Sequence, residues 1–247
     1  MTRMVRLRRG LAPWLTALSE KVLIDYSETE RAEAISALKV CHGLGFGLAG
    51  THRTGKTTLA KKLSETLGLP FLETSVKAIA VEYGFDVDHH SDFDARMDWQ
   101  EYLLGRLSEK YEAMGDTAFV TDRTPLCMMA YTLADAPNGP ITHEMDDRVK
   151  SYMDACMALT ERHFALVGVI QSGIKFEPVA GAPAFNAAYQ EKVSSVVVAS
   201  ALELKSANIF ILEKDCTDLG VRHETLLTEW NDVIEYYTLG IQALPAC

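Results

Sequence analysis

Residues 50–57 read Gly-Thr-His-Arg-Thr-Gly-Lys-Thr and decide the fold of this 247-residue chain. They match the pattern G-x-x-x-x-G-K-[ST], in which glycines let backbone N–H groups turn toward a phosphate. The pattern carries weight only between a strand and a helix. Residues 45–49 before it are apolar and bounded by glycine, and residues 57–67 after it carry leucines at helical spacing. The sequence therefore predicts a phosphate-binding loop.

The loop predicts which groups touch a bound nucleotide. The residues expected to hold it are Gly50, Thr51, His52, Arg53, Thr54, Gly55, Lys56, Thr57 and Thr58. Lys56 can reach the β- and γ-phosphates, and the Thr57 hydroxyl can ligate Mg²⁺. The Arg53 side chain either neighbours the phosphates or points to solvent. Residues 213–216 read Glu-Lys-Asp-Cys, where GTPases carry N-K-x-D, so the predicted cofactors are ATP and Mg²⁺.

Strands and helices alternate along the rest of the chain. Apolar runs predict further strands at 70–74, 117–121, 164–170 and 208–212. Periodic segments predict helices at 75–83, 91–114, from 125 onward, 143–162, 186–205 and 218–239. This alternation predicts an α/β P-loop NTPase fold, a doubly wound five-stranded parallel sheet with helices on both faces. Ligands of such sheets collect at the carboxyl ends of the strands.

The chain divides into a helical N-terminal extension over residues 1–40 and a P-loop domain over residues 41–247. Residues 171–185 contain glycines and prolines and are expected to form a lid-like loop. Lids of small kinases usually bring arginines over the phosphates, but this one contains none. Either Lys175, Arg123 and Arg162 supply that charge, or the lid differs from the common one.

Composition limits the class of protein. A net charge of −10 argues against nonspecific DNA binding by the whole body. The basic cluster Arg3, Arg6, Arg8 and Arg9 either touches nucleic acid or is a solvated tail. Five scattered cysteines without C-x-x-C spacing read as reduced thiols of a cytoplasmic protein without a zinc site. The apolar residues 11–18 are too short for a membrane span.

Asp122 and Arg123 end the strand predicted at 117–121. P-loop proteins hold Mg²⁺ through an acid at this point, so Asp122 is the second predicted metal ligand. ATP-driven motors usually carry Glu next, to polarise water, and Arg123 stands there instead. Arg123 can neutralise charge on a transferred phosphoryl group, which favours a kinase over an ATPase. The alternative is a structural ion pair between the two residues.

Four further residues are candidates for the acceptor side of the site. Glu73 ends the second strand and either accepts a proton from a substrate hydroxyl or stabilises the start of a helix. Lys77 either binds a substrate phosphate or is solvated. Gln100, on the long helix with Arg96 nearby, can pair with the edge of a base. Its neighbour Trp99 either stacks on the base or belongs to the core.

The chain resembles the P-loop kinases grouped with the nicotinamide-riboside-kinase-like AAA family, which are frequent in bacteriophages. The matching stretches are residues 50–58, 99–107 and 119–126, within a region of roughly 44–215. The Asp-Arg pair and the preceding Gln also resemble deoxynucleoside kinases. That resemblance implies that Asp122 holds Mg²⁺ and Arg123 supports the transferred phosphate. It further implies that Gln100 reads the base and that Glu73 is the catalytic base.

Two departures from the family are visible, the lid without arginines and the N-terminal forty residues without a counterpart. Related phage kinases include ones that phosphorylate 5-hydroxymethyluracil within DNA, and only the basic N-terminus points in that direction. We therefore expect an ATP-dependent kinase whose acceptor is a nucleoside, a nucleotide or a hydroxymethylated pyrimidine in phage DNA. The alternatives are a P-loop ATPase or switch that acts through a partner protein, and a nucleic-acid-binding module with a degenerate loop. The intact Lys56 and Thr57 argue against the latter.

Overall fold

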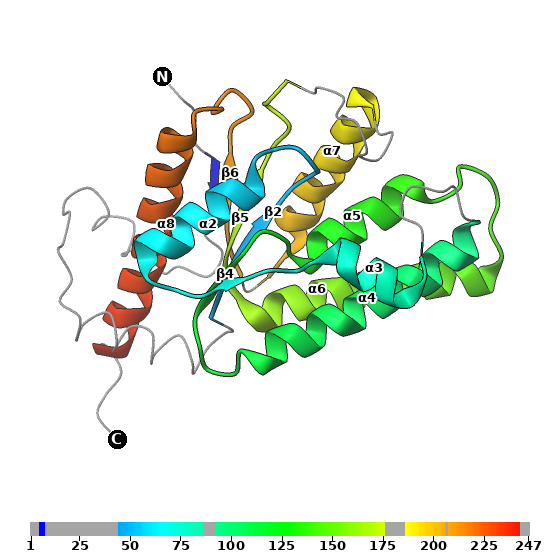
Figure 1. Cartoon of the computed structure of the whole chain (residues 1–247), viewed down its shortest axis with the longest axis horizontal. Helices are drawn as coiled ribbons and strands as arrows, with labels where there is room; N and C mark the ends of the chain where they lie inside the picture. The colour runs from blue at the N-terminus through cyan, green and yellow to red at the C-terminus, as the bar shows by residue number, and fades with distance from the viewer. Residues whose placement is uncertain (1–4, 8–43, 86–91, 176–185, 206, 243–247) are drawn as a thin grey trace.

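The central sheet is built around β2 (Gly45–Ala49), the strand that leads into the phosphate loop (Figure 1). On one side β2 pairs in parallel with β4 (Phe119–Thr121), which pairs with β3 (Phe71–Leu72). On the other side it pairs in parallel with β5 (Phe164–Ile170), which pairs with β6 (Asn208–Leu212). The predicted five-stranded parallel sheet is confirmed. The structure is a computed structural model that describes residues 5–7, 44–85, 92–175, 186–205 and 207–242.

A sixth strand, which we did not predict, closes one edge of the sheet. It is β1 (Val5–Leu7), which runs antiparallel to β6 with Val5 opposite Ile211 and Leu7 opposite Ile209. Three residues are too few to show the alternation that marks a strand in a sequence. The N-terminal extension, predicted to be helical, thus contains a strand near its start. Residues 8–43, including the helices expected at 11–40, lie outside the described residues.

Helices cover both faces of the sheet (Figure 1). One face carries α2 (Lys56–Leu67) and α8 (Leu219–Gln242). The other face carries α4 (Phe93–Ala113), α5 (Pro125–Asp135), α6 (His143–His163) and α7 (Ala187–Glu203), and α3 (Val76–Tyr83) packs against α4. No described helix has the length and apolar character that a bilayer crossing requires.

Alternation along β2 separates two hydrophobic cores. Phe46 and Leu48 point toward α2 and α8, where the Trp230 ring stacks on Phe46 at 5.2 Å. Gly47 faces the other side, where an added Cβ would lie 2.4 Å from the Thr124 methyl group and 2.7 Å from the Phe164 ring. A glycine at this position therefore lets the start of α5 approach the strand beside the phosphate loop.

Local signals place the helices that flank the site. Asp92 accepts a hydrogen bond from the Ala95 N–H at 2.8 Å and begins α4 as its N-cap. Gly84 ends α3 in the left-handed conformation, with φ 77°. These two helices carry Lys77 and Gln100 to the carboxyl edge of the sheet.

Candidate functional site

The loop between β2 and α2 has the backbone that its glycines predict. Gly50 has φ 148°, and a Cβ there would lie 2.3 Å from the Ile170 carbonyl oxygen. Gly55 has φ 80° and precedes the first residue of α2. Arg53 also has a positive φ, 58°, which residues other than glycine rarely adopt. The loop thus wraps the N-terminus of α2, where backbone N–H groups and the helix dipole favour an anion.

Lys56 lies inside this loop. Its Nζ donates a hydrogen bond to the Thr51 carbonyl and another, at 3.3 Å, to Thr54 Oγ1. Burial lowers the pKa of Lys56 to about 8; Cys127 and Asp122 act against this shift, and the Arg123 charge adds to it. The side chain is therefore mostly an ammonium at neutral pH, placed at the centre of the loop.

Thr57 and Asp122 form an oxygen pair next to Lys56. The Thr57 hydroxyl donates to Asp122 Oδ2 at 2.5 Å, and the Thr74 hydroxyl donates to Asp122 Oδ1 at 3.4 Å. Mg²⁺ prefers hard oxygen ligands and keeps several waters. A hydroxyl and a carboxylate at the mouth of a phosphate loop fit that requirement, so Thr57 and Asp122 are the residues that would hold the ion.

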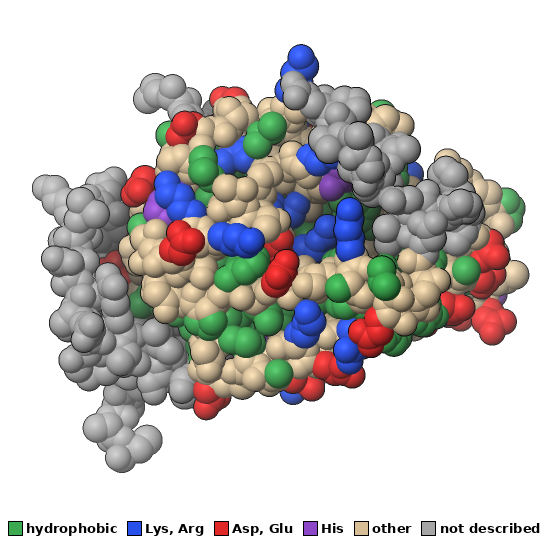
Figure 2. All heavy atoms as spheres, in the orientation of Figure 1, with side chains coloured by type: hydrophobic (Ala, Val, Ile, Leu, Met, Phe, Trp, Pro, Cys, Tyr) green, Lys and Arg blue, Asp and Glu red, His purple; other side chains and the backbone are tan. Residues whose placement is uncertain are grey.

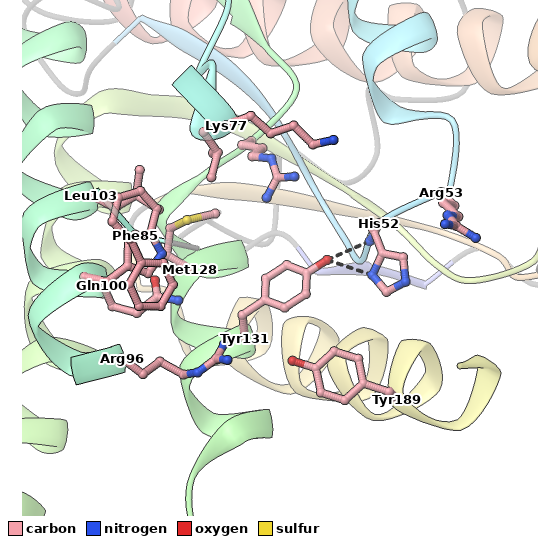
Figure 3. A pocket seen from close by; sticks show the side chains of 13 residues that line it. His52, Arg53, Lys77, Phe85, Arg96, Gln100, Leu103, Met128, Tyr131 and Tyr189 are labelled. Atoms are coloured by element: carbon pink, nitrogen blue, oxygen red, sulfur yellow. Dashed lines mark hydrogen bonds between the residues drawn. The ribbon is translucent and has the colours of Figure 1, made fainter. Parts of the chain in front are cut away.

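Side chains from three helices hold the loop in place, and sequence reasoning missed them. Tyr131 Oη accepts the His52 N–H at 2.8 Å (Figure 3), and Gln190 Nε2 donates to the His52 carbonyl at 2.9 Å. The Arg222 guanidinium, only 2% exposed, donates to the Thr54 carbonyl at 2.7 Å and to the Cys216 carbonyl at 2.5 Å. A polar residue on an apolar helix face is the signal for such a role.

A pocket of about 300 Å³ opens beside the loop. Its lining includes Lys77, Arg96 and Gln100, the three residues proposed for the substrate (Figure 3). Arg53 and Arg123 also belong to the lining. The structure therefore gathers residues from α3, α4, the phosphate loop and the end of β4 around one space.

The deep wall of the pocket combines an aromatic stack with an oriented amide. Phe85 stacks on Trp99 with ring centroids 5.2 Å apart and planes 8° from parallel. Trp99 is 3% exposed, so it belongs to the core and also lines the pocket. Buried Tyr152 donates its hydroxyl to Gln100 Oε1 at 3.3 Å. This bond occupies the amide oxygen and leaves the Gln100 NH₂ group as the donor for a ligand.

Arg96 is held at the side of the pocket. Its guanidinium lies 2.6 Å from Asp135 Oδ2, and the Tyr189 hydroxyl donates to Asp135 Oδ1 at 2.7 Å. The charge of Arg96 is therefore largely balanced by a carboxylate. It shapes the wall more than it adds free positive charge.

Glu73, the predicted catalytic base, lies outside the pocket lining. It is exposed, and its carbonyl accepts a hydrogen bond from Lys110 at 3.1 Å. Because neighbouring residues of an extended segment point to opposite sides, Thr74 contacts Asp122 instead. Ser75 then turns the chain into α3 with φ 49°.

Of the three cations suggested for the lid, Arg123 lines the pocket and Arg162 lies apart. Arg162 sits just before β5, at the amino edge of the sheet, 3.9 Å from Glu112, so it is too far to serve the phosphates. Lys175 is exposed after β5, and residues 176–185 of the predicted lid lie outside the described residues.

Comparison with known proteins agrees with this geometry. A family model described as an AAA domain matches residues 46–169. No curated protein matches the sequence.

Three similar solved structures are two kinases and a NadR protein. Deoxyadenosine kinase from M. mycoides with dCMP and dCDP superposes with a TM-score of 0.56 at 16% identity, covering 76% of this chain and 99% of that one. The NadR protein with NAD and AMP-PNP gives 0.55 at 14%, covering 88% and 54%. Thymidylate kinase from Ehrlichia chaffeensis gives 0.52 at 12%, covering 76% and 99%. The chain thus shares the fold of P-loop nucleoside and nucleotide kinases.

Proposed function

This chain belongs to the AAA domain family, and from that premise we propose that it is an ATP- and Mg²⁺-dependent kinase. Its acceptor is a nucleoside, a nucleotide or a hydroxymethylated pyrimidine in DNA. The observation that carries the proposal is the position of Lys56, Thr57 and Asp122 beside a pocket whose wall presents the Gln100 amide. A kinase needs such a second compartment, and a nucleotide switch does not.

Each side chain has a task in the transfer. The loop and Lys56 bind the β- and γ-phosphates. Thr57 and Asp122 would hold Mg²⁺, which would neutralise phosphate charge. Arg123 stabilises the charge on the γ-phosphoryl group as its bond to the β-phosphate oxygen breaks and a bond to an acceptor oxygen forms. ADP leaves, and a hydroxyl acceptor releases its proton to Asp122 or to water. Gln100 and the Phe85–Trp99 stack position the base of the acceptor.

DNA remains among the acceptors because of the basic N-terminus and the resemblance to phage kinases. Deleting the first ten residues would remove the strand β1 together with the arginines. Substituting the arginines is therefore the better test, because it changes only the charge. Replacing Arg3, Arg8 and Arg9 with Gln keeps Val5–Leu7. If DNA is the acceptor, the substitutions lower activity on DNA. They also flatten the slope of log DNA affinity against log salt concentration, by about one unit for each arginine that contacts a phosphate.

An assay with γ-labelled ATP tests the proposal. The protein is incubated with deoxynucleosides, their 5′-monophosphates, nicotinamide riboside and DNA that contains 5-hydroxymethyluracil, and the products are separated by thin-layer chromatography. Label in one acceptor class supports a kinase. Release of labelled phosphate at the same rate with every acceptor and with none supports an ATPase instead.

A further inference from the structure

The acceptor pocket is cationic in an acidic protein. The chain carries a net charge of −10, yet the pocket lining includes Arg53, Lys77, Arg96 and Arg123. Among the described residues that line it there is no carboxylate. Figure 2 shows Lys and Arg side chains gathered around the hollow in the middle of this face. Positive walls around a low-dielectric space concentrate anions.

The positive potential acts on a group inside the site. The pKa of His52 is lowered to about 4, first by burial and then by the charges of Lys56, Arg53 and Arg123. The imidazole is therefore neutral at physiological pH. A negative ligand placed near the same three cations would be stabilised by the interaction that disfavours the imidazolium.

Two of the four pocket cations have no carboxylate partner within the described part of the chain. Arg96 is held by Asp135 at 2.6 Å. In contrast, no described acid lies within ion-pair distance of the Lys77 ammonium or the Arg123 guanidinium. Lys77 reaches over the pocket from α3 (Figure 3), and Arg123 directly follows the metal-binding candidate Asp122. Lys77 is an exposed side chain of the pocket lining and Arg123 also faces the γ-phosphoryl group, so a phosphate on the acceptor would gain charge-assisted contacts to both.

We propose that the acceptor already carries a phosphate, which Lys77 and Arg123 bind beside the γ-phosphate of ATP. The inference rests on the proposed kinase function and narrows it: a free nucleoside is a poor acceptor. Two sources offer the required chemistry, a free nucleoside 5′-monophosphate and a nucleotide within a DNA strand. In both, the cations bind the phosphate and the Gln100 amide faces the base. The accepting oxygen is a phosphate oxygen of the monophosphate or the hydroxymethyl oxygen of the base in DNA.

The test compares each deoxynucleoside with its own 5′-monophosphate and with an oligonucleotide that contains 5-hydroxymethyluracil. Two charge-assisted contacts predict that a phosphate-bearing acceptor has a kcat/KM about 100-fold higher than the matching nucleoside. The two phosphate-bearing arms identify the source. Because the contacts are between charges, raising the salt concentration is expected to lower the kcat/KM ratio between the phosphate-bearing acceptor and the nucleoside.

Single variants assign the contact. Lys77→Gln is expected to raise the acceptor KM about tenfold and to leave the KM of ATP unchanged. Lys205→Gln removes the same charge from an exposed position before β6, at the opposite edge of the sheet, and is expected to change neither. An unchanged acceptor KM in Lys77→Gln overturns the inference.

Binding measured without ATP separates this inference from the proposed function. Calorimetry with deoxynucleosides and their monophosphates reports affinity even if none of them is phosphorylated. Tighter binding of the monophosphates supports the phosphate site, and equal or weaker binding overturns it. Efficient phosphorylation of nucleosides alone contradicts the inference and leaves the kinase function standing. Absence of ATP binding contradicts the kinase function itself.

Discussion

The Thr57 hydroxyl donates a 2.5 Å hydrogen bond to Asp122, although 65 positions separate them in the sequence. Thr57 lies in the first turn of α2, and Asp122 directly follows β4. Because β2 and β4 are parallel neighbours, both residues arrive at the carboxyl edge of the sheet. The contact brings a hydroxyl and a carboxylate together beside the phosphate loop, and these are the oxygen ligands that would hold Mg²⁺.

Asp122→Asn is expected to abolish the Mg²⁺ dependence of activity while nucleotide still binds weakly. The amide is a poorer ligand for Mg²⁺, whereas Lys56 and the loop backbone remain. Titration of Mg²⁺ in the transfer assay, alongside fluorescence titration of ATP, separates the two effects. An unchanged Mg²⁺ titration would remove Asp122 from the metal site.

Lys56→Ala is expected to lower kcat by at least about 100-fold, the scale of losing one pre-placed charge contact to the transferring group. The fold should persist because the Lys56 ammonium contacts only groups of its own loop. Circular dichroism and the melting temperature check this. Lys62→Ala, on the same helix, is the matched control. Near-normal kcat in a folded Lys56→Ala protein is the outcome that the account does not allow.

The affinity for ATP is expected to fall above pH 8. The pKa of Lys56 is lowered to about 8 by burial, so the side chain is charged below this value and loses its charge above it. Bound phosphate favours the ammonium, so binding above this pH takes up a proton and affinity drops by up to about tenfold per pH unit. The variant Lys56→Met should bind weakly at every pH. If the ATP affinity of the unaltered protein stayed constant up to about pH 9.5, the lowered pKa of Lys56 would be contradicted.

Most of the fold was predictable because its elements are marked locally. The strands Phe164–Ile170 and Asn208–Leu212 are apolar apart from Gly168 and Asn208, and their bounds match the prediction. The helix α3 ends at Gly84, and the helix α4 begins at the Asp92 cap. The exception is β1, whose three residues pair with a strand more than 200 positions away and carry no local pattern.

The site was predictable where a motif fixes it and not where packing does. The positions of Lys56, Thr57 and Asp122 follow from the loop and the strand that neighbours it. The exposed position of Glu73, outside the pocket lining, depends on a two-residue strand and the turn at Ser75. The contacts that Arg222 and Gln190 make to the loop depend on how distant helices pack. Sequence periodicity identifies a helix face but not its partner.

Gln100→Leu is expected to raise the acceptor KM by about tenfold with little change in the KM of ATP, because a buried donor to the base is lost. Tyr152→Phe keeps the ring and removes only the hydroxyl that holds the Gln100 carbonyl. It should raise the same KM by less, about threefold. Steady-state kinetics with both substrates varied provides the measurement. Equal increases in both KM values would indicate a general loss of structure instead.

The most direct test of the central claim is the rate of ADP formation with and without acceptor. No Glu follows Asp122 to activate water, and the acceptor pocket lies beside the phosphate loop. The account predicts slow hydrolysis alone and a rate at least about 100-fold higher when a nucleoside, nucleotide or hydroxymethylated DNA acceptor is present, with label recovered in that acceptor. Fast ADP formation that none of these acceptors changes would contradict the kinase function and favour an ATPase.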